Sequence, residues 1–342
     1  MNRVTDQNPA DFGFYMPGEY EPHSCCWMAW PCREGLWAND SATAKEYADV
    51  ANTIARFEPV MMLAPPDRVA AARALLCDNV TVIEMSIDDS WCRDSGPNFL
   101  VNDKGELAGS KWKFNAWGNK YDPYDQDALM GSRILERVGV REFTSPMVAE
   151  GGAITVDGEG TVITTESCLL NRNRNPGWSR AEIEAELCRT LGVEKVIWLP
   201  GDVEETETDG HVDGVAAFVE PGHVLVEINT DRTDPHYSVG QENLNALKGQ
   251  IDARGRKLEI EFIEEGPYHP GLWNEGCSSY VNSYLANSAV IVPGYGYERD
   301  AAAVETYQRL YPDRNIVQVY IGHIALGGGG VHCITQQQPL PN

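Results

Sequence analysis

The sequence predicts an α/β protein in which five similar units form a ring around a central site. The first reason is a recurring unit of strand, polar loop, amphipathic helix and strand. Its first strands begin near Val162, Val224 and Val290, at steps of 62 to 66 residues. The second reason is that five short polar or glycine-rich motifs introduce further strands at intervals of 53 to 67 residues. Such self-similarity favours a radial or stacked repeat. A doubly wound sheet, the main alternative, would carry one dominant phosphate loop near its first strand, and none is present.

The predicted units follow one another along the chain. The N-terminal part of the chain fits two units. The first consists of the strand CWMAWP, a helix at 42–57 and the strand VMMLAP, and the second covers residues 98–143. Three clearer units are TVITTESCLL with KVIWLP, HVLVEI with a helix at 241–253 and KLEIEFI, and AVIVPG with a helix at 301–310 and NIVQVYI. The strands that stand between them begin at motifs around Asp94, Glu150, Asp213, Tyr280 and Cys333.

The sequence contains both a start signal and a stop signal for the helix that follows TVITTESCLL. Ser179 and Glu182 form the S-x-x-E pattern of a capping box, which starts a helix. Apolar residues at i, i+4 and i+8 from Ile183 then share one face, and Gly192 ends the helix. We therefore expect residues 1–342 to form one domain of repeated ββαβ-type units.

The charge of the chain excludes several partners. Its 27 basic and 51 acidic residues give a net charge of −24, which argues against binding to nucleic acid or to an anionic membrane surface. No run of about 18 apolar residues predicts a membrane span. The acidity is explained by solubility alone, or by an acidic cleft that concentrates a cationic substrate.

The cysteines and the N-terminus favour the cytoplasm. The nine cysteines are odd in number and scattered, and no CxxC pair accompanies the cluster of Cys25, Cys26 and Cys32. A disulfide framework and a structural zinc site are therefore not expected. The N-terminal segment lacks the apolar stretch of a signal peptide.

Cys333 is the strongest candidate for a reactive group. It lies in GGGGVHCITQQQ, and the four glycines allow close backbone approach to a ligand. Backbone N–H groups around it could lower the pKa of its thiol. A free cysteine is more often a small buried hydrophobe, but that interpretation leaves four consecutive glycines unexplained.

His211 and Asp213 form a second candidate pair in DGHVDGVAAF. Residues i and i+2 of a strand point to the same side, so the imidazole and the carboxylate would face one site. Histidine is the natural group for proton transfer near neutral pH. A satisfied core histidine is the alternative.

Two more carboxylates stand next to turn residues. Asp94 lies in DDSWCRDSGP, where the alternative is a surface pair with Arg93, and Glu150 lies in VAEGGAITV, where the alternative is a solvated turn. One thiol, one imidazole and three carboxylates suit a cationic electrophile better than the acyl group of a peptidase substrate. A guanidinium carries five N–H donors in a planar fork that carboxylates bind bidentately.

Five segments that span Met16 to Pro339 identify a family. They are MPGEYEPHSCCWMAWP, DDSWCRDSGP, EGGAITVDGEGTVITTESCLLNRNRNP, ETDGHVDGVAAFVEPG and GGGGVHCITQQQP. In these segments the sequence resembles the agmatine deiminases of the guanidine-modifying, amidinotransferase-like superfamily, which are related to bacterial peptidyl-arginine deiminases. The resemblance implies a five-bladed α/β propeller with pseudo-fivefold repeats, a homo-oligomer, and no metal or organic cofactor.

The resemblance also assigns roles to the site residues. It makes Cys333 the nucleophile and His211 the general acid and base. Asp94 and Asp213 would clamp the guanidinium, and Glu150 would bind it and assist proton transfer. The implied reaction converts agmatine, a small cationic guanidino compound, to N-carbamoylputrescine and ammonia through a covalent thiouronium on the cysteine.

The end of the substrate farthest from the guanidinium is less well defined by the motifs. Gly18, Tyr20, Ala153, Gly214 and Ala217 depart from the residues common in the family. We expect an amine-ended substrate whose possible contacts are Trp91, Trp117 and an acidic cluster of Asp88, Asp89, Glu205 and Asp209. Arg93 is the one motif-borne partner for a substrate carboxylate.

Three alternatives remain open at this point. The enzyme could act on another guanidino compound or on peptidyl-arginine. It could be a metal-dependent hydrolase with His211, Asp213, Glu150 and Asp94 as ligands. It could also be a catalytically silent polyamine-binding ring, although binding a cation would not require the thiol.

Overall fold

Five separate sheets make up the β-structure of the computed structural model, which describes residues 3–4, 7–234, 236–266 and 277–341. The first contains β1 (Arg3–Val4), β7 (Arg141–Val148), β6 (Leu107–Lys113) and β5 (Asn98–Val101), in that order. The second contains β10 (Lys195–Leu199), β9 (Thr161–Thr165) and β8 (Ile154–Val156). The third contains β11 (Ala216–Glu220), β12 (His223–Ile228) and β13 (Glu259–Glu264). The fourth contains β14 (Tyr284–Ala286), β15 (Ala289–Gly294) and β16 (Asn315–Tyr320). The fifth contains β17 (Thr335–Pro339), β2 (His23–Ala29), β3 (Val60–Ala64) and β4 (Val80–Glu84).

The five sheets share one strand pattern. In each sheet, a first strand pairs antiparallel with a second strand. The second strand then pairs parallel with a third strand that follows a helix. In the second sheet, for example, β8 pairs antiparallel with β9, and β9 pairs parallel with β10. A parallel pair needs a crossover connection, and a helix supplies it in each unit. The crossover helices are α1 (Asp40–Ile54), α5 (Asp127–Val138), α7 (Arg180–Leu191), α8 (Tyr237–Leu247) and α9 (Arg299–Leu310). The predicted α/β class and repeating ββαβ unit are therefore confirmed.

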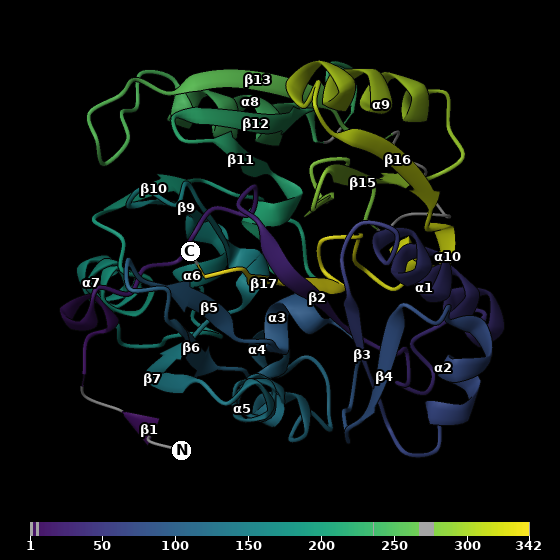
Figure 1. Ribbon diagram of the computed structural model, residues 1–342. Coiled ribbons are helices and arrows are strands. Elements are labelled where there is room, and N and C mark those ends of the chain that lie inside the picture. The colour runs from purple at the N-terminus through teal and green to yellow at the C-terminus, as the bar shows by residue number, and fades with distance from the viewer. Residues whose placement is uncertain (1–2, 5–6, 235, 267–276, 342) are drawn as a thin grey trace.

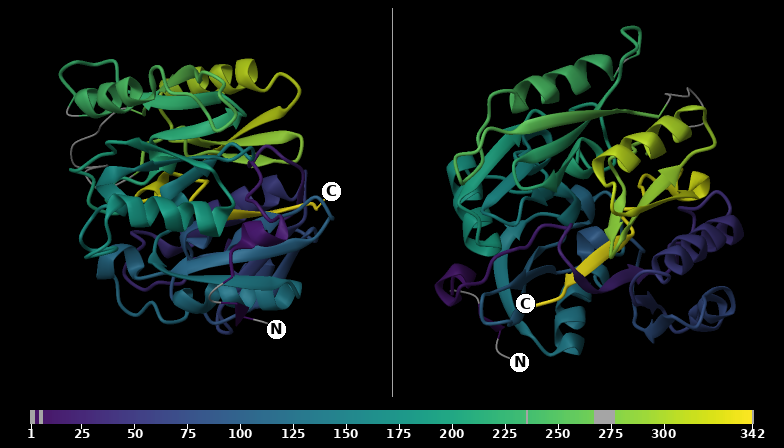
Figure 2. Two further views of the ribbon diagram at one scale, coloured as in Figure 1. Left: turned by 90° about the vertical axis from the view of Figure 1, so that its left-hand side faces the viewer. Right: turned by 45° about the horizontal axis from the view of Figure 1, so that its top comes forward.

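The sheets follow one another around the middle of the molecule (Figure 1). The fifth sheet joins the two ends of the chain, because the late strand β17 pairs antiparallel with the early strand β2, from Thr335 opposite Met28 to Pro339 opposite His23. Both strands cross the middle of the view, and the yellow C-terminal segment reaches the same central place in the turned views of Figure 2. This pairing brings Cys333 to the N-terminal motifs.

The helix ends follow local chemistry where the sequence made them readable. Ser179 and Glu182 form the capping box of α7, and Gly192 ends that helix with φ 66°. The prediction was wrong by about a turn at α8, which lies at Tyr237–Leu247 instead of 241–253. Lys248 follows the last helical residue with ψ 123°, outside the helical region, and Gly249 has φ 81°, so the helix cannot continue.

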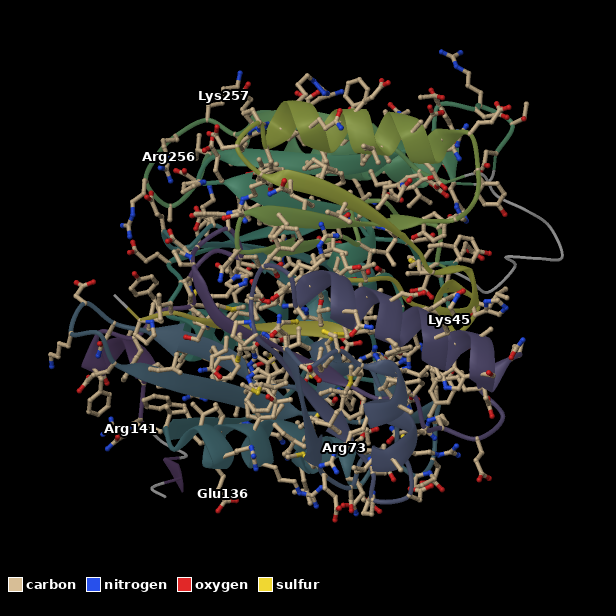
Figure 3. All side chains as sticks on the ribbon, turned by 45° about the vertical axis from the view of Figure 1, so that its right-hand side comes forward. Lys45, Arg73, Glu136, Arg141, Arg256 and Lys257 are labelled. Atoms are coloured by element: carbon tan, nitrogen blue, oxygen red, sulfur yellow. The ribbon has the colours of Figure 1, made fainter. Side chains whose placement is uncertain are left out.

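The core consists of buried faces between the sheets and their helices. One cluster packs α1 and α9 against β2, β3 and β15, with Tyr47, Val50 and Val290 fully buried. A fully buried side chain of this size contributes about 1.5–3 kcal/mol. Charged side chains such as Lys45, Arg73, Glu136 and Lys257 extend from the outer surface (Figure 3). Within the described residues, no helix has the length and apolar character needed to cross a membrane.

Candidate active site

Cys333 lies in the turn that leads into β17. Its side chain is 8% exposed, and its backbone carbonyl accepts a hydrogen bond from the N–H of Arg93 over 3.1 Å. Arg93 and Asp94 belong to α3 (Cys92–Ser95), a single turn of helix. The bond therefore links the thiol segment directly to the element that carries Asp94.

Three polar atoms converge beside Gly152, which belongs to the short helix η2 (Gly151–Ala153). A Cβ atom at Gly152 would lie 2.6 Å from His211 Nδ1, 2.8 Å from Asp94 Oδ1 and 2.9 Å from Asp213 Oδ2. All three distances are too short for a real Cβ, so any side chain at this position would collide with the site. The Cys333 thiol joins this group, since it donates to Asp213 Oδ2 over 3.6 Å.

His211 stands between two carboxylates. Its Nε2 lies 3.3 Å from Glu150 Oε2, and its Nδ1 lies 3.8 Å from Asp94 Oδ1, too far for a hydrogen bond. Nδ1 is buried without a hydrogen-bond partner among the described residues. Burial lowers the pKa of His211, but Asp94, Cys168 and Glu150 outweigh it and hold the pKa well above the ordinary value. The two carboxylates therefore favour the imidazolium form of His211.

Glu150 is ionised and fixed from behind. Its Oε1 accepts a hydrogen bond from Arg174 Nε over 2.7 Å, and both side chains are fully buried. Burial raises the pKa of Glu150, yet Arg174 and His211 outweigh burial and lower it. Arg174 is in turn paired with Asp209 over 2.6 Å. This chain holds the carboxylate against His211.

Asp94 is held by two donors. Gly152 N–H donates to its Oδ1 over 2.9 Å and Trp117 Nε1–H donates to its Oδ2 over 2.8 Å. Trp117 has φ 53°, in the left-handed region, where a tryptophan is strained. Burial raises the pKa of Asp94, while the His211 charge opposes the rise. A bound guanidinium would supply further positive charge to this carboxyl.

Asp213 remains ionised for a different reason. Burial would raise its pKa, but the hydrogen bond and charge of His332 lead the groups that lower it. His332 Nδ1 lies 2.8 Å from Asp213 Oδ2.

The surroundings of Cys333 favour the protonated thiol over the thiolate. Burial raises its pKa well above the ordinary value, and the Asp213 and Asp94 carboxylates add to the rise. A backbone hydrogen bond from Gly330 lowers it, but by less than these. The lowering backbone contribution expected from the sequence is therefore present, but burial and the carboxylates around Cys333 outweigh it, because they disfavour a further negative charge on the thiol.

A cavity of ≈ 250 Å³ opens from Cys333 and His211 toward solvent. This is close to the lower end of the range for small-molecule sites. Seven carboxylates line it, and its described lining contains neither arginine nor lysine: the acidic residues are Asp202, Glu204, Glu205, Glu207, Asp213, Glu227 and Glu265. The cavity is therefore suited to a cation.

Known proteins identify the family to which this site belongs. Residues 15–339 match the family described as Porphyromonas-type peptidyl-arginine deiminase. An agmatine deiminase of Pseudomonas aeruginosa strain LESB58 is 44% identical over 368 residues, which cover 100% of this chain and 99% of that protein. The chain belongs to the agmatine deiminase and peptidyl-arginine deiminase family.

Two further comparisons agree with this placement. An agmatine deiminase of Stutzerimonas stutzeri strain A1501 is 44% identical over 360 residues, with 97% of each chain covered. The solved agmatine deiminase of Enterococcus faecalis superimposes with a TM-score of 0.97 at 38% identity, and 100% of each chain is covered.

The structure brings together the five side chains that this family member was expected to use. One reason given for them was wrong: His211 and Asp213 do not share a strand face. His211 precedes the short helix η3 (Val212–Gly214), Asp213 lies inside it, and β11 begins later, at Ala216. The two side chains face one site because the η3 turn directs them there.

The four acidic residues that were expected to contact the distal part of the substrate have different partners within the protein. Asp88 and Asp89 accept hydrogen bonds from Gln126 N–H and Arg33. Glu205 accepts backbone N–H groups of its own loop, and Asp209 pairs with Arg174. Each of these four carboxylates thus has a partner within the protein, and Glu205 also lines the cavity.

Trp91 packs under the glycine loop, with Trp37 as a neighbour at a ring-centroid distance of 5.6 Å. Arg93 is 1% exposed and pairs with Glu19, so it is not available to a substrate carboxylate.

Several residues of the site were missed by sequence reasoning. Asn282 donates a hydrogen bond from Nδ2 to Cys333 Sγ over 3.2 Å. It lies in the fourth of the five predicted motifs, but the sequence pattern indicated Tyr280 there. The signals for the others were present within quoted motifs: Glu19 in MPGEYEP, Arg174 in NRNRNP, Cys168 in TESCLL and His332 beside the nucleophile.

The described His, Cys, Asp and Glu side chains close enough to hold one metal ion are Glu150, Cys168 and His211. They are not the set expected for a metal-dependent hydrolase, since Asp94 and Asp213 lie outside it. The Arg174 guanidinium already occupies Glu150 Oε1, and its positive charge opposes a second cation.

Proposed function

We propose that the protein is an agmatine deiminase, which hydrolyses agmatine to N-carbamoylputrescine and ammonia. The observation that carries the proposal is the convergence of His211 Nδ1, Asp94 Oδ1 and Asp213 Oδ2 beside Gly152, with the Cys333 thiol in contact with Asp213. Two carboxylates match the planar fork of a guanidinium. An imidazolium and a thiol supply the acid and the nucleophile.

Binding of the substrate activates the nucleophile. The guanidinium is bound by Asp94 and Asp213 and places a positive charge beside Cys333 Sγ, which lowers the pKa of the thiol. The thiol loses its proton to solvent through the cavity. The thiolate then lies next to an electrophilic carbon that two carboxylates hold in position.

The first half-reaction transfers the amidine carbon to sulfur. The Cys333 thiolate attacks the central carbon and forms a C–S bond, which gives a neutral tetrahedral adduct. The C–N bond to one terminal nitrogen breaks as His211 donates its proton to that nitrogen, and ammonia leaves. An S-alkylthiouronium cation remains on Cys333, and His211 is now neutral.

The second half-reaction is hydrolysis. Neutral His211, oriented by Glu150, takes a proton from water, and the oxygen attacks the thiouronium carbon. The C–S bond breaks, and the ureido product passes its extra proton to the sulfur. Cys333 returns to the thiol and His211 to the imidazolium, so the cycle closes without a metal or organic cofactor.

The cavity favours an amine-ended substrate. Seven acidic side chains and no arginine or lysine occur in its described lining, and its two histidines, His211 and His236, already face Glu150 and Glu265, so an α-carboxylate would meet net repulsion. Arg93, the one candidate partner from the motifs, is buried against Glu19. We therefore propose agmatine over free arginine, and we include peptidyl-arginine as a competing substrate in the test.

We propose that Trp91 and Trp117 form part of the wall of the guanidinium subsite. Trp117 supports this through its hydrogen bond to Asp94, and Trp91 through its position beneath the loop that precedes Cys333. Both side chains also exclude water from the carboxylates, which strengthens electrostatic binding.

The wider organisation is also a proposal. The shared strand pattern of the five sheets supports a single five-bladed propeller whose axis passes through the site. Exposed Phe262 and Tyr320 on the edge strands β13 and β16 support a homo-oligomer. Nine free cysteines support a reducing compartment, the cytoplasm.

Ammonia release from agmatine, arginine, other guanidino compounds and an arginyl peptide tests the function. We expect turnover of agmatine and no turnover by Cys333→Ala, which still binds agmatine. His211→Ala is expected to be inactive, and Asp213→Asn to raise KM and lower kcat. Cys188→Ala, at a half-buried cysteine of α7 outside the lining of the cavity, is the matched control and should leave turnover unchanged. Normal activity of Cys333→Ala would end the covalent mechanism, and preference for the peptide would reassign the substrate.

A further inference from the structure

A buried row of charged side chains holds Asp213 from behind, and the reaction steps above do not use it. His332 Nδ1 lies 2.8 Å from Asp213 Oδ2, and His332 Nε2 lies 2.9 and 3.1 Å from the two carboxylate oxygens of Glu19. Glu19 is in turn 3.3 Å from an Arg93 guanidinium nitrogen. These side chains are 16% exposed or less.

The two contacts of His332 determine its charge. A neutral imidazole has one N–H donor and one lone pair, whereas an ionised carboxylate only accepts hydrogen bonds. Neutral His332 could therefore bond only one of its two carboxylate neighbours. The imidazolium bonds both, and the row then alternates in sign from Asp213 through His332 and Glu19 to Arg93. Alternation is the arrangement in which buried charges compensate one another.

The groups that face His332 agree with this assignment. Glu19 and Asp213 face its ring, Arg93 donates from Nε to its backbone carbonyl over 3.3 Å, and Cys333 is its chain neighbour. Tyr307 and Tyr311 line the same small cavity behind the ring and are occupied with backbone carbonyls. Burial and Arg93 lower the pKa of His332, but the two carboxylates outweigh them and raise it.

We propose that His332 and Glu19 are positioning residues: His332 stays an imidazolium throughout the cycle and holds Asp213 ionised and oriented toward the guanidinium. The two histidines of the site then have separate tasks. Both nitrogens of His332 are occupied, so it cannot exchange protons with the substrate. His211 has a free, buried Nδ1 and exchanges them. This inference rests on the proposed deiminase function.

Two substitutions at one position separate the contacts of His332. The amide nitrogen of Asn matches the place of Nδ1, so His332→Asn keeps a donor for Asp213. The longer Gln matches Nε2, so His332→Gln keeps a donor for Glu19 and loses the one for Asp213. Glu19→Gln removes the second negative charge and leaves His332 itself intact.

The expected results concern ammonia release from agmatine across pH. His332→Asn should reduce kcat/KM by about 10-fold or less, because it keeps the donor for Asp213 and loses only the hydrogen bond to Glu19. His332→Gln should reduce it by about 100-fold, the effect of a misplaced binding group. Glu19→Gln should be active at low pH and lose kcat/KM as the pH rises, because neutral His332 can turn a lone pair toward Asp213. Equal losses in the Asn and Gln variants, with an unchanged pH profile in Glu19→Gln, would overturn the proposal.

A second measurement does not depend on the variants folding. The imidazole ¹⁵N NMR signals of the unsubstituted enzyme at pH 8, with His332 assigned through its sequential connections to Val331 and Cys333, should report two protonated nitrogens. A neutral ring would overturn the proposal. Failure of the proposed function would appear differently, as an unsubstituted enzyme that releases no ammonia from any guanidino compound while His332 is still an imidazolium.

Discussion

The side-chain amide of Asn282 donates a hydrogen bond to Sγ of Cys333 over 3.2 Å. The orientation of this amide is fixed, because its oxygen accepts the backbone N–H groups of His332 and Cys333 over 2.9 and 3.3 Å. Gly330 packs so closely on Asn282 that a Cβ there would lie 2.4 Å from the amide oxygen. The last glycine of the motif thus lets the loop close around a donor to sulfur.

Removal of this donor should weaken the nucleophile. A hydrogen bond to a charged group contributes about 1.5–3 kcal/mol, so Asn282→Ala should lower kcat/KM by about 10- to 100-fold. Asn282→Asp should lower it further, because a new carboxylate disfavours the thiolate. Steady-state ammonia release measures both variants. If Asn282→Asp were as active as the unsubstituted enzyme, the amide would have no part in stabilising the sulfur.

The raised pKa of Cys333 predicts slow alkylation in the absence of substrate. Only the thiolate reacts with iodoacetamide, and burial together with Asp213 keeps the thiol protonated at neutral pH. Peptide mass spectrometry should therefore find exposed Cys77 alkylated first, and Cys333 alkylated at a rate that continues to rise above pH 9. Rapid alkylation of Cys333 at pH 6 would instead mean a resting thiolate.

The repeat and its motifs were predictable because they are encoded in local patterns. The capping box at Ser179 and Glu182 requires only neighbours in sequence and appears where expected. The predicted strand TVITTESCLL is only half right, because β9 ends at Thr165 and the short helix α6 (Glu166–Leu169) follows it. The five catalytic candidates could be found because each lies within three residues of a glycine and a few residues before a strand. Their mutual distances could not be predicted, since they depend on turns such as η2 and η3 that have no periodic signal.

What the sequence could not reveal is which charge neutralises which. Arg93 looked like a partner for a substrate carboxylate, but it pairs with Glu19, 74 positions away. Asp209 looked like a substrate contact, but it pairs with Arg174. In a chain with 51 acidic residues, the sequence offers each arginine many possible acidic partners and does not distinguish among them. Only the folded arrangement selects among them.

The Arg174–Glu150 pair predicts that chelators have no effect. Arg174 Nε donates to Glu150 Oε1 over 2.7 Å with both side chains fully buried, so a divalent cation at Glu150 would be placed against a fixed positive charge. Dialysis against EDTA should leave ammonia release unchanged, whereas prolonged treatment with iodoacetamide should abolish it. The reverse pattern would favour a metal-dependent hydrolase.

The pairing of Glu19 with His332 predicts a pH-dependent contribution to stability. Burial raises the pKa of Glu19, but His332 and Arg93 outweigh it and lower the pKa from 4.5 to about 2. A carboxyl with a lowered folded pKa stabilises the fold fully above its unfolded value, and this stabilisation is lost as the pH falls toward the folded value. The shift corresponds to about 3 kcal/mol. Glu19→Gln should therefore reduce the free energy of unfolding in urea by about that amount at pH 7, and the difference should shrink below pH 4.5.

The matched control is Glu136→Gln, at an exposed glutamate on the outer surface of α5 (Figure 3). It should leave the unfolding curve unchanged at both pH values, since an isolated surface charge contributes little. A difference between Glu19→Gln and the unsubstituted protein that stays constant from pH 7 to pH 3 would mean that Glu19 stabilises the fold by packing alone. A difference that disappears with acid would mean that its charge, held between His332 and Arg93, supplies the stabilisation.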